Sequence, residues 1–100
     1  MNDYHDSVYN FMIETITELF PRVARTHTFT SKTRFVEDLD LDSLDAAEIA
    51  TYLDEYFNMD FINEDNVEEI AAFRAAFRGT IEDMVQLLMK LIKEKYIQWE

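Results

Sequence analysis

Glycine and proline are almost absent from this sequence, and their scarcity constrains the fold more than any other feature. The 100 residues include one glycine, Gly79, and one proline, Pro21, whereas leucine, isoleucine, methionine, alanine and phenylalanine are abundant. Glycine and proline are the residues that disfavour a helix most, so a chain that nearly lacks both favours helix. A chain of this length holds one small domain. We therefore expect a single all-α domain over residues 1–100.

The spacing of apolar residues predicts four helices. They run from about 3 to 20, from 43 to 57, from 64 or 65 to 79, and from 80 toward the C-terminus. Asp3 can cap the first helix and Pro21 discourages its continuation. Gly79 offers a C-terminal stop to the third, and Thr80 with Asp83 resembles a capping pair that opens the fourth.

The segment from Pro21 to about Leu41 has apolar residues but no sustained period. We expect a long loop between the first and second helices. A loop of that length in a compact domain is unusual and tends to be functional.

Acidic residues dominate the charge of the chain. There are 21 Asp and Glu against 9 Lys and Arg, a net charge of −12, and between Phe35 and Phe73 there is no basic residue at all. Nucleic acid and anionic membranes are therefore poor partners. A protein with a basic patch is a good one, since complementary charge raises the encounter rate. The simpler interpretation is a solvated acidic surface.

The chain has no cysteine, which excludes disulfides, a thiol nucleophile and a cysteine-based zinc site. Any thiol chemistry must come from a prosthetic group. The N-terminus lacks the basic and apolar regions of a signal peptide, and no apolar run approaches the length that spans a membrane. We expect a cytoplasmic monomer.

Ser43 is the best candidate for a functional atom. It lies between an acidic approach and an amphipathic helix, with Asp42 and Leu44 beside it. The start of a helix presents unpaired backbone N–H groups and the positive end of the macrodipole, which stabilise an anion. The position suits a phosphate ester, although the hydroxyl could also act only as a helix cap.

The sequence around Ser43 resembles the F-x-x-D-L-x-x-D-S-L signature of acyl carrier proteins. The matching residues are Phe35, Asp38, Leu39, Asp42, Ser43 and Leu44, followed by Asp45 and Glu48. Chain length, acidity and helical periodicity agree with the resemblance, which covers most of the chain from about Val8 to Leu88. A short match alone would be weak.

The resemblance implies an acyl-carrier-like four-helix bundle with a long loop between helices one and two. It implies that a phosphopantetheinyl transferase attaches 4′-phosphopantetheine from coenzyme A to Ser43, with Asp42 and Leu44 as flanking contacts. Such a protein is not an enzyme. It holds acyl groups as thioesters and presents them to synthase or acyl-transferring enzymes with basic patches, in fatty acid, polyketide or specialised lipid pathways.

The two faces of the second helix suggest two further sets of residues. At about 100° per residue, one face is acidic, and by resemblance it would dock partner enzymes through Leu44, Asp45, Glu48, Thr51 and Glu55. The other face is apolar. Helical phase and the resemblance together suggest an acyl pocket lined by Ala50, Leu53, Phe57, Ile62 and Phe73.

The chain departs from the family pattern in two places. Asp40 stands where the family usually has glycine, and if that position needs positive φ, aspartate is one of the few substitutes that tolerate it. The segment Ala71–Gly79 is an apparent insertion. It either lengthens the third helix and adds Phe73 and Phe77 to the core, or reshapes the pocket with a basic contact from Arg74 and Arg78, which are four residues apart.

Other functional classes fit the sequence less well. The first half of a calcium-binding loop is imitated by the alternating residues Asp38, Asp40 and Asp42. However, Ser43 stands where that loop requires glycine, and Ile49 stands at the position of its twelfth residue, a ligand. We therefore expect no metal site. No catalytic residues are expected either, because neither His5 nor His27 has a triad-like context. The main alternative is an unmodified acidic adaptor that binds a basic protein.

Overall fold

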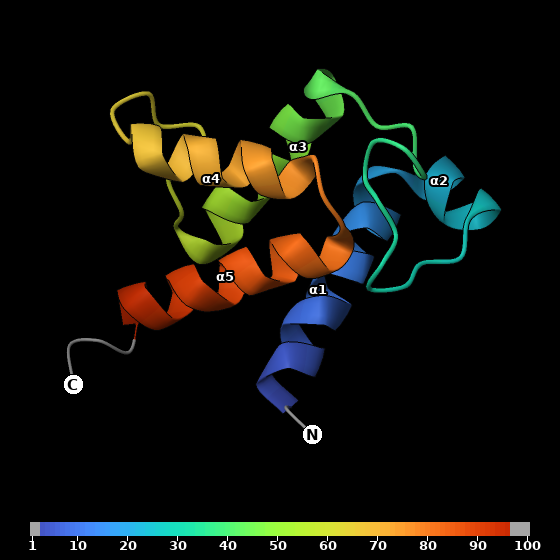
Figure 1. Cartoon of the computed structure of the whole chain (residues 1–100), viewed down its shortest axis with the longest axis horizontal. Helices are drawn as coiled ribbons and strands as arrows, with labels where there is room; N and C mark the ends of the chain where they lie inside the picture. Colours follow the sequence, from blue (N-terminus) through green and yellow to red (C-terminus); the bar gives the residue numbers. More distant parts are fainter. Residues whose placement is uncertain (1–2, 97–100) are drawn as a thin grey trace.

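The computed structural model describes residues 3–96, and within that part every regular element is a helix. The five helices are α1 (Asp3–Leu19), α2 (Pro21–Thr26), α3 (Ser43–Phe57), α4 (Val67–Phe77) and α5 (Ile81–Tyr96), as Figure 1 shows. The all-α prediction is confirmed. No helix among these residues is both long and apolar enough to cross a membrane.

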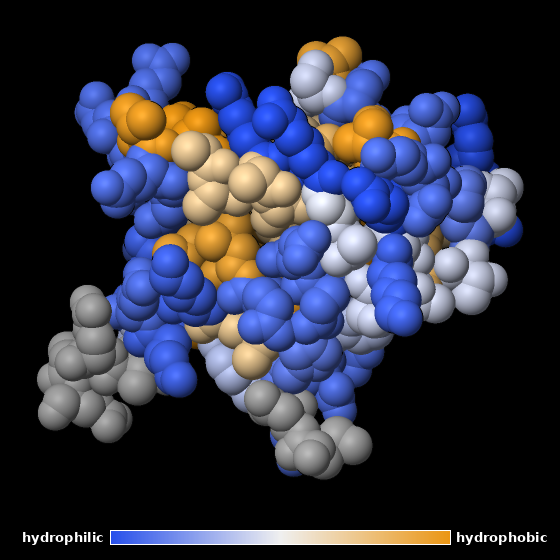
Figure 2. Space-filling view, viewed as in Figure 1, coloured by the Kyte–Doolittle hydropathy of each residue, from blue (hydrophilic) through white to orange (hydrophobic). Residues whose placement is uncertain are grey.

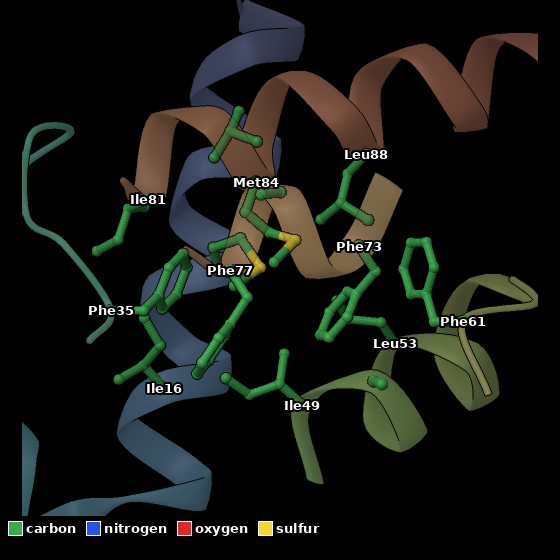
Figure 3. Packing of buried hydrophobic residues seen from close by; sticks show 14 of the residues in the cluster. Ile16, Phe35, Ile49, Leu53, Phe61, Phe73, Phe77, Ile81, Met84 and Leu88 are labelled. Carbon is green, nitrogen blue, oxygen red and sulfur yellow. The ribbon is translucent and has the colours of Figure 1, made fainter. Parts of the chain in front are cut away.

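Helix α5 packs against both α1 and α4. Ile81, Met84, Val85 and Leu88 are spaced by three or four residues along one face of α5 and are fully buried. Phe73 and Phe77 of α4 and Ile49 and Leu53 of α3 surround this face (Figure 3). Phe73 and Phe77 therefore belong to the core, as the prediction of a lengthened third helix required.

Most of the predicted helix boundaries agree with the structure. The helix predicted from 43 to 57 has those bounds in α3. The third helix begins at Val67, slightly later than predicted, because the side chain of Asn66 caps it by accepting the Glu69 N–H at 3.2 Å. Helix α1 begins at Asp3, the first residue that the structure describes, so the cap predicted there stays a prediction.

The predicted capping pair at the start of α5 is confirmed. The Thr80 hydroxyl accepts the Asp83 N–H at 3.2 Å, and the Asp83 carboxylate accepts the Thr80 N–H at 2.9 Å. Gly79 does follow the end of α4, but it does not have the positive φ of a glycine stop. Its lack of a side chain matters for another reason, since a Cβ there would collide with the Asp83 carboxylate.

The prediction of an irregular segment from Pro21 to Leu41 is wrong at its beginning. Pro21 occupies the first turn of α2, where its missing N–H costs nothing and its fixed φ suits a helix. The remaining connection, 27–42, is tied to the start of α5: Phe35 N–H donates to the Gly79 carbonyl at 3.3 Å, and Ile81 N–H donates to the Thr33 carbonyl at 2.8 Å.

Candidate functional site

Ser43 is the first residue of α3 and is exposed to solvent. Asp42, and not Ser43, is the N-cap, so the interpretation of the serine as a helix cap is wrong. The hydroxyl of Ser43 makes no hydrogen bond to any part of the chain between residues 3 and 96. It is therefore available to an enzyme that would modify it.

Two aspartates hold Ser43 in place. Asp45 N–H donates to the Asp42 carboxylate at 3.0 Å, and Asp42 N–H donates to the Asp45 carboxylate at 3.0 Å, which forms a complete capping box. Before this box the chain turns at Asp40, whose φ of 58° is in the left-handed region that aspartate tolerates better than most residues. Leu39 and Leu41 on either side of it are buried. The buried side chains of Leu39 and Leu41 therefore hold the segment before Ser43 against the core.

A cavity of about 760 Å³ opens beside Ser43, between α3, α4 and the segments before each of them. Its lining residues are Val36, Leu41, Asp42, Ser43, Ala46, Ala47, Ala50, Phe61, Ile62, Glu64, Ile70, Phe73, Arg74, Phe77 and Arg78. Most of these are apolar. The volume is in the range typical of small-molecule pockets.

Only part of the predicted pocket lines this cavity. Ala50, Ile62 and Phe73 do, whereas Leu53 and Phe57 do not. Leu53 is completely buried in the core, and Phe57 packs against Phe11 of α1 with ring centroids 4.9 Å apart. Helical phase placed Ala50, Leu53 and Phe57 on the apolar side of one helix, and the resemblance added Ile62 and Phe73. Neither could tell which of these residues line the cavity and which pack in the core or against α1.

Arg74 and Arg78 both line the cavity. Their side chains are exposed, and neither forms an ion pair with any residue that the structure describes. In the space-filling view, hydrophobic side chains gather over α4 with hydrophilic ones around them (Figure 2). The cavity thus combines a largely apolar lining with a hydroxyl and two guanidinium groups that have no partner among the described residues.

The outer face of α3 carries the predicted docking residues. Leu44 is 75% exposed, and Glu48, Thr51 and Glu55 are also exposed. The last three line a shallow depression of about 360 Å³ together with Leu19, Ala47 and Tyr52. Asp45 differs from them, because it is partly buried and its carboxylate is engaged in the capping box.

Asp54 is a structural residue of the site that sequence reasoning missed. Its carboxylate accepts the N–H groups of Phe61 at 2.8 Å and Ile62 at 3.0 Å, two residues that line the cavity. Burial raises the pKa of Asp54, an effect that the two N–H donors partly offset. No local sequence pattern marks this contact, because its partners are seven and eight residues away in a loop.

The histidines lie away from Ser43 and do not line the cavity. His5 Nε2 contacts the Glu82 carboxylate at 2.8 Å, which raises the pKa of His5. His27 Nδ1 lies 2.9 Å from the Thr26 hydroxyl. Among residues 3–96 there is also no group of three or more carboxylate or imidazole side chains placed to hold a metal ion.

No family model, curated protein or solved structure matches the chain. Ser43 and the cavity beside it are therefore the features from which a function can be inferred.

Proposed function

We propose that this protein is a non-catalytic acyl carrier whose Ser43 bears 4′-phosphopantetheine. The observation that carries the proposal is an exposed serine hydroxyl that makes no hydrogen bond to residues 3–96 and lines a largely apolar cavity. A carrier needs both features, an attachment atom within reach of a modifying enzyme and apolar space for cargo beside it.

The modification is a transfer of phosphopantetheine from coenzyme A. Ser43 Oγ attacks the phosphorus that bears the pantetheine, the hydroxyl loses its proton, and adenosine bisphosphate leaves. The capping box keeps Asp42 and Asp45 occupied with backbone N–H groups, so neither competes for the hydroxyl. The attached arm supplies the thiol that the chain lacks, which holds an acyl group as a thioester.

The proposal assigns the long helices α1, α3, α4 and α5 to the four-helix bundle of a carrier. Helix α2 is then an addition within the long connection between the first two bundle helices. The lengthened α4 is a second addition, and it brings Arg74 and Arg78 to the cavity. Both additions favour a specialised carrier over a general one, in a fatty acid, polyketide or lipid pathway.

The outer face of α3 is the proposed docking surface for the transferase and for synthase or acyl-transferring enzymes. It carries Glu48 and Glu55 for contact with a basic patch, and Leu44 as an exposed apolar contact near Ser43. Interfaces commonly combine an apolar centre with charges at the rim that steer association.

The alternative is an unmodified acidic adaptor that uses the same face of α3. Such a protein has no need of a free hydroxyl beside a cavity. Under this alternative Ser43 would act only as a helix cap, but the N-cap of α3 is Asp42.

Intact-protein mass distinguishes the two proposals. The chain is incubated with coenzyme A and a phosphopantetheinyl transferase of broad specificity. We expect a gain of one phosphopantetheine in the wild type and in Ser7→Ala, a control at an exposed serine of α1, and no gain in Ser43→Ala. An unmodified wild type, or a gain that persists in Ser43→Ala, would refute the carrier assignment.

A further inference from the structure

Arg74 and Arg78 are the two basic residues that line the cavity beside Ser43. No basic residue occurs between Phe35 and Phe73, and these two arginines follow directly after that acidic stretch. Arg34, the basic residue that precedes the stretch, is paired with Glu37 at 2.8 Å. Arg74 and Arg78 have no ion-pair partner in the described part of the chain, although Asp42 and Glu64 line the same cavity. Two positive charges are therefore available there.

Buried contacts fix the position of the two arginines relative to Ser43. Phe77 lies between them in sequence and stacks on Phe35, with ring centroids 5.3 Å apart. The Phe35 carbonyl in turn accepts the Leu41 N–H at 3.1 Å, directly before the cap of α3. The end of α4 and the start of α3 are thus joined through the core, and they lie at the same side of the molecule in Figure 1.

Nearby cations would stabilise the phosphodiester of a modified Ser43. A phosphodiester on Oγ adds a negative charge at the edge of a cavity that Asp42 and Glu64 already line. Uncompensated like charges would repel it. Guanidinium groups match phosphate oxygens with paired N–H donors and are weakly hydrated, which makes arginine the usual choice for this task.

We infer that Arg74 and Arg78 bind the phosphate of the arm on Ser43 and direct the arm into the cavity. The inference rests on the proposed function. Most of the remaining lining of this cavity is apolar, with Ala50, Ile70 and Phe73 among its residues. An arm held by its phosphate at this edge places its cargo against those side chains and out of water, so that the loaded carrier is a closed state that a partner enzyme must open.

The test compares the modified and unmodified forms of each variant. The positive charges are removed in Arg74→Gln, in Arg78→Gln and in the double glutamine variant. A double lysine variant, Arg74→Lys with Arg78→Lys, keeps the charges but lacks the paired N–H donors. The control is the double variant Arg22→Gln with Arg25→Gln. Arg22 and Arg25 are exposed on α2 and do not line the cavity. The readouts are the phosphorus NMR shift of the phosphodiester and the melting temperature of the modified form minus that of the unmodified form.

In the wild type, we expect the phosphorus NMR shift of the phosphodiester to change with salt concentration. In the double glutamine variant this salt dependence should disappear. The melting difference should fall by about 4 °C in that variant, a change typical of about 1 kcal/mol in a domain of this size. The lysine variant should be intermediate and the α2 control unchanged. Subtracting the unmodified form removes any effect of the substitutions on the fold itself.

The possible failures are distinguishable. If Ser43 gains no mass, both the proposed function and this inference fall. If Ser43 is modified normally but the shift and the melting difference match the wild type in the double glutamine variant, only this inference is overturned. A slower transfer to a partner enzyme without any change at the phosphate would also overturn it, because the arginines would then contact the partner.

Discussion

Asp42 and Asp45 cap one another across the first turn of α3, each carboxylate accepting the other's backbone N–H at 3.0 Å. Ser43 lies between them, and its hydroxyl takes no part in the cap. From sequence alone, these two acidic side chains would be assigned to solvent or to a partner. In the structure their hydrogen bonds instead hold the start of α3 in place beside Ser43. The Ser43 hydroxyl can stay exposed without destabilising the helix, because the carboxylates of Asp42 and Asp45 already accept backbone N–H groups at the start of α3.

Substitutions at Asp42 and Ser43 should therefore differ in stability. Asp42→Ala removes the N-cap and should lower the free energy of unfolding by about 1 kcal/mol. Ser43→Ala removes no hydrogen bond within the described chain and should stay within about 0.5 kcal/mol of the wild type. Urea denaturation followed by circular dichroism measures both. A loss in Ser43→Ala as large as in Asp42→Ala would mean that the serine caps the helix.

Charge reversal on the outer face of α3 should slow modification of Ser43. Glu48→Lys and Glu55→Lys remove exposed charges that would steer a basic partner, and the loss should be larger at low salt, where screening is weak. Glu94→Lys on α5 is the matched control. Asp45→Lys is unsuitable, because it also breaks the capping box. Equal rates for all three variants at low ionic strength would exclude this face as the docking surface.

Asp54 should be important for the shape of the cavity. Asp54→Ala leaves the N–H of Phe61, a residue only 3% exposed, without its acceptor. Loss of a buried partner typically costs about 1–3 kcal/mol. Asp54→Asn keeps one acceptor oxygen and removes the half-buried charge, so it should cost less. Thermal denaturation of the two variants tests the order, and a less stable Asn variant would contradict it.

The contact of His5 with Glu82 predicts a pH dependence of stability. The hydrogen bond to Glu82 raises the pKa of His5 above the ordinary 6.5, and Asp6 at 3.6 Å adds to the effect. The folded state therefore binds the proton more tightly than the unfolded state does. This stabilisation is fully present below pH 6.5 and is lost as the pH rises through the folded pKa.

Unfolding measured at about pH 6 and about pH 8, on either side of the ordinary histidine value, should show this loss in the wild type. His5→Asn should have a smaller difference between the two conditions, since asparagine does not titrate. His27→Asn is the control, because His27 contacts no carboxylate in the described chain and should leave the difference unchanged. A pH difference that is the same in His5→Asn and the wild type would disprove the role of this pair.

Gly79→Ala should destabilise the junction of α4 and α5. A Cβ at residue 79 would collide with the Asp83 carboxylate, which must then leave the Thr80 N–H that it caps. We expect a loss of about 1 kcal/mol, the typical value of a cap. In Asp83→Ala the cap is already gone, so adding Gly79→Ala should have little further effect. Additive losses in the double variant would contradict this explanation.

The sequence by itself determined the helical class, the bounds of α3 and the capping pair Thr80 and Asp83. Each of these depends on residues within one or two turns of each other. Helical periodicity and capping are local properties, so they can be predicted without knowledge of the fold. The prediction of an exposed Leu44 was also of this kind, because helical phase alone places it opposite the core.

Only the tertiary structure decided which apolar residues line the cavity, which aspartate caps α3, and what Asp54 contacts. It also decided that Arg74 and Arg78 face the cavity that Ser43 lines. Leu53 and Ala50 lie on one apolar side of α3, yet one is enclosed in the core and the other lines the cavity. Periodicity gives the direction of a side chain from its helix axis, whereas its neighbours depend on how distant segments pack, and no local pattern encodes that.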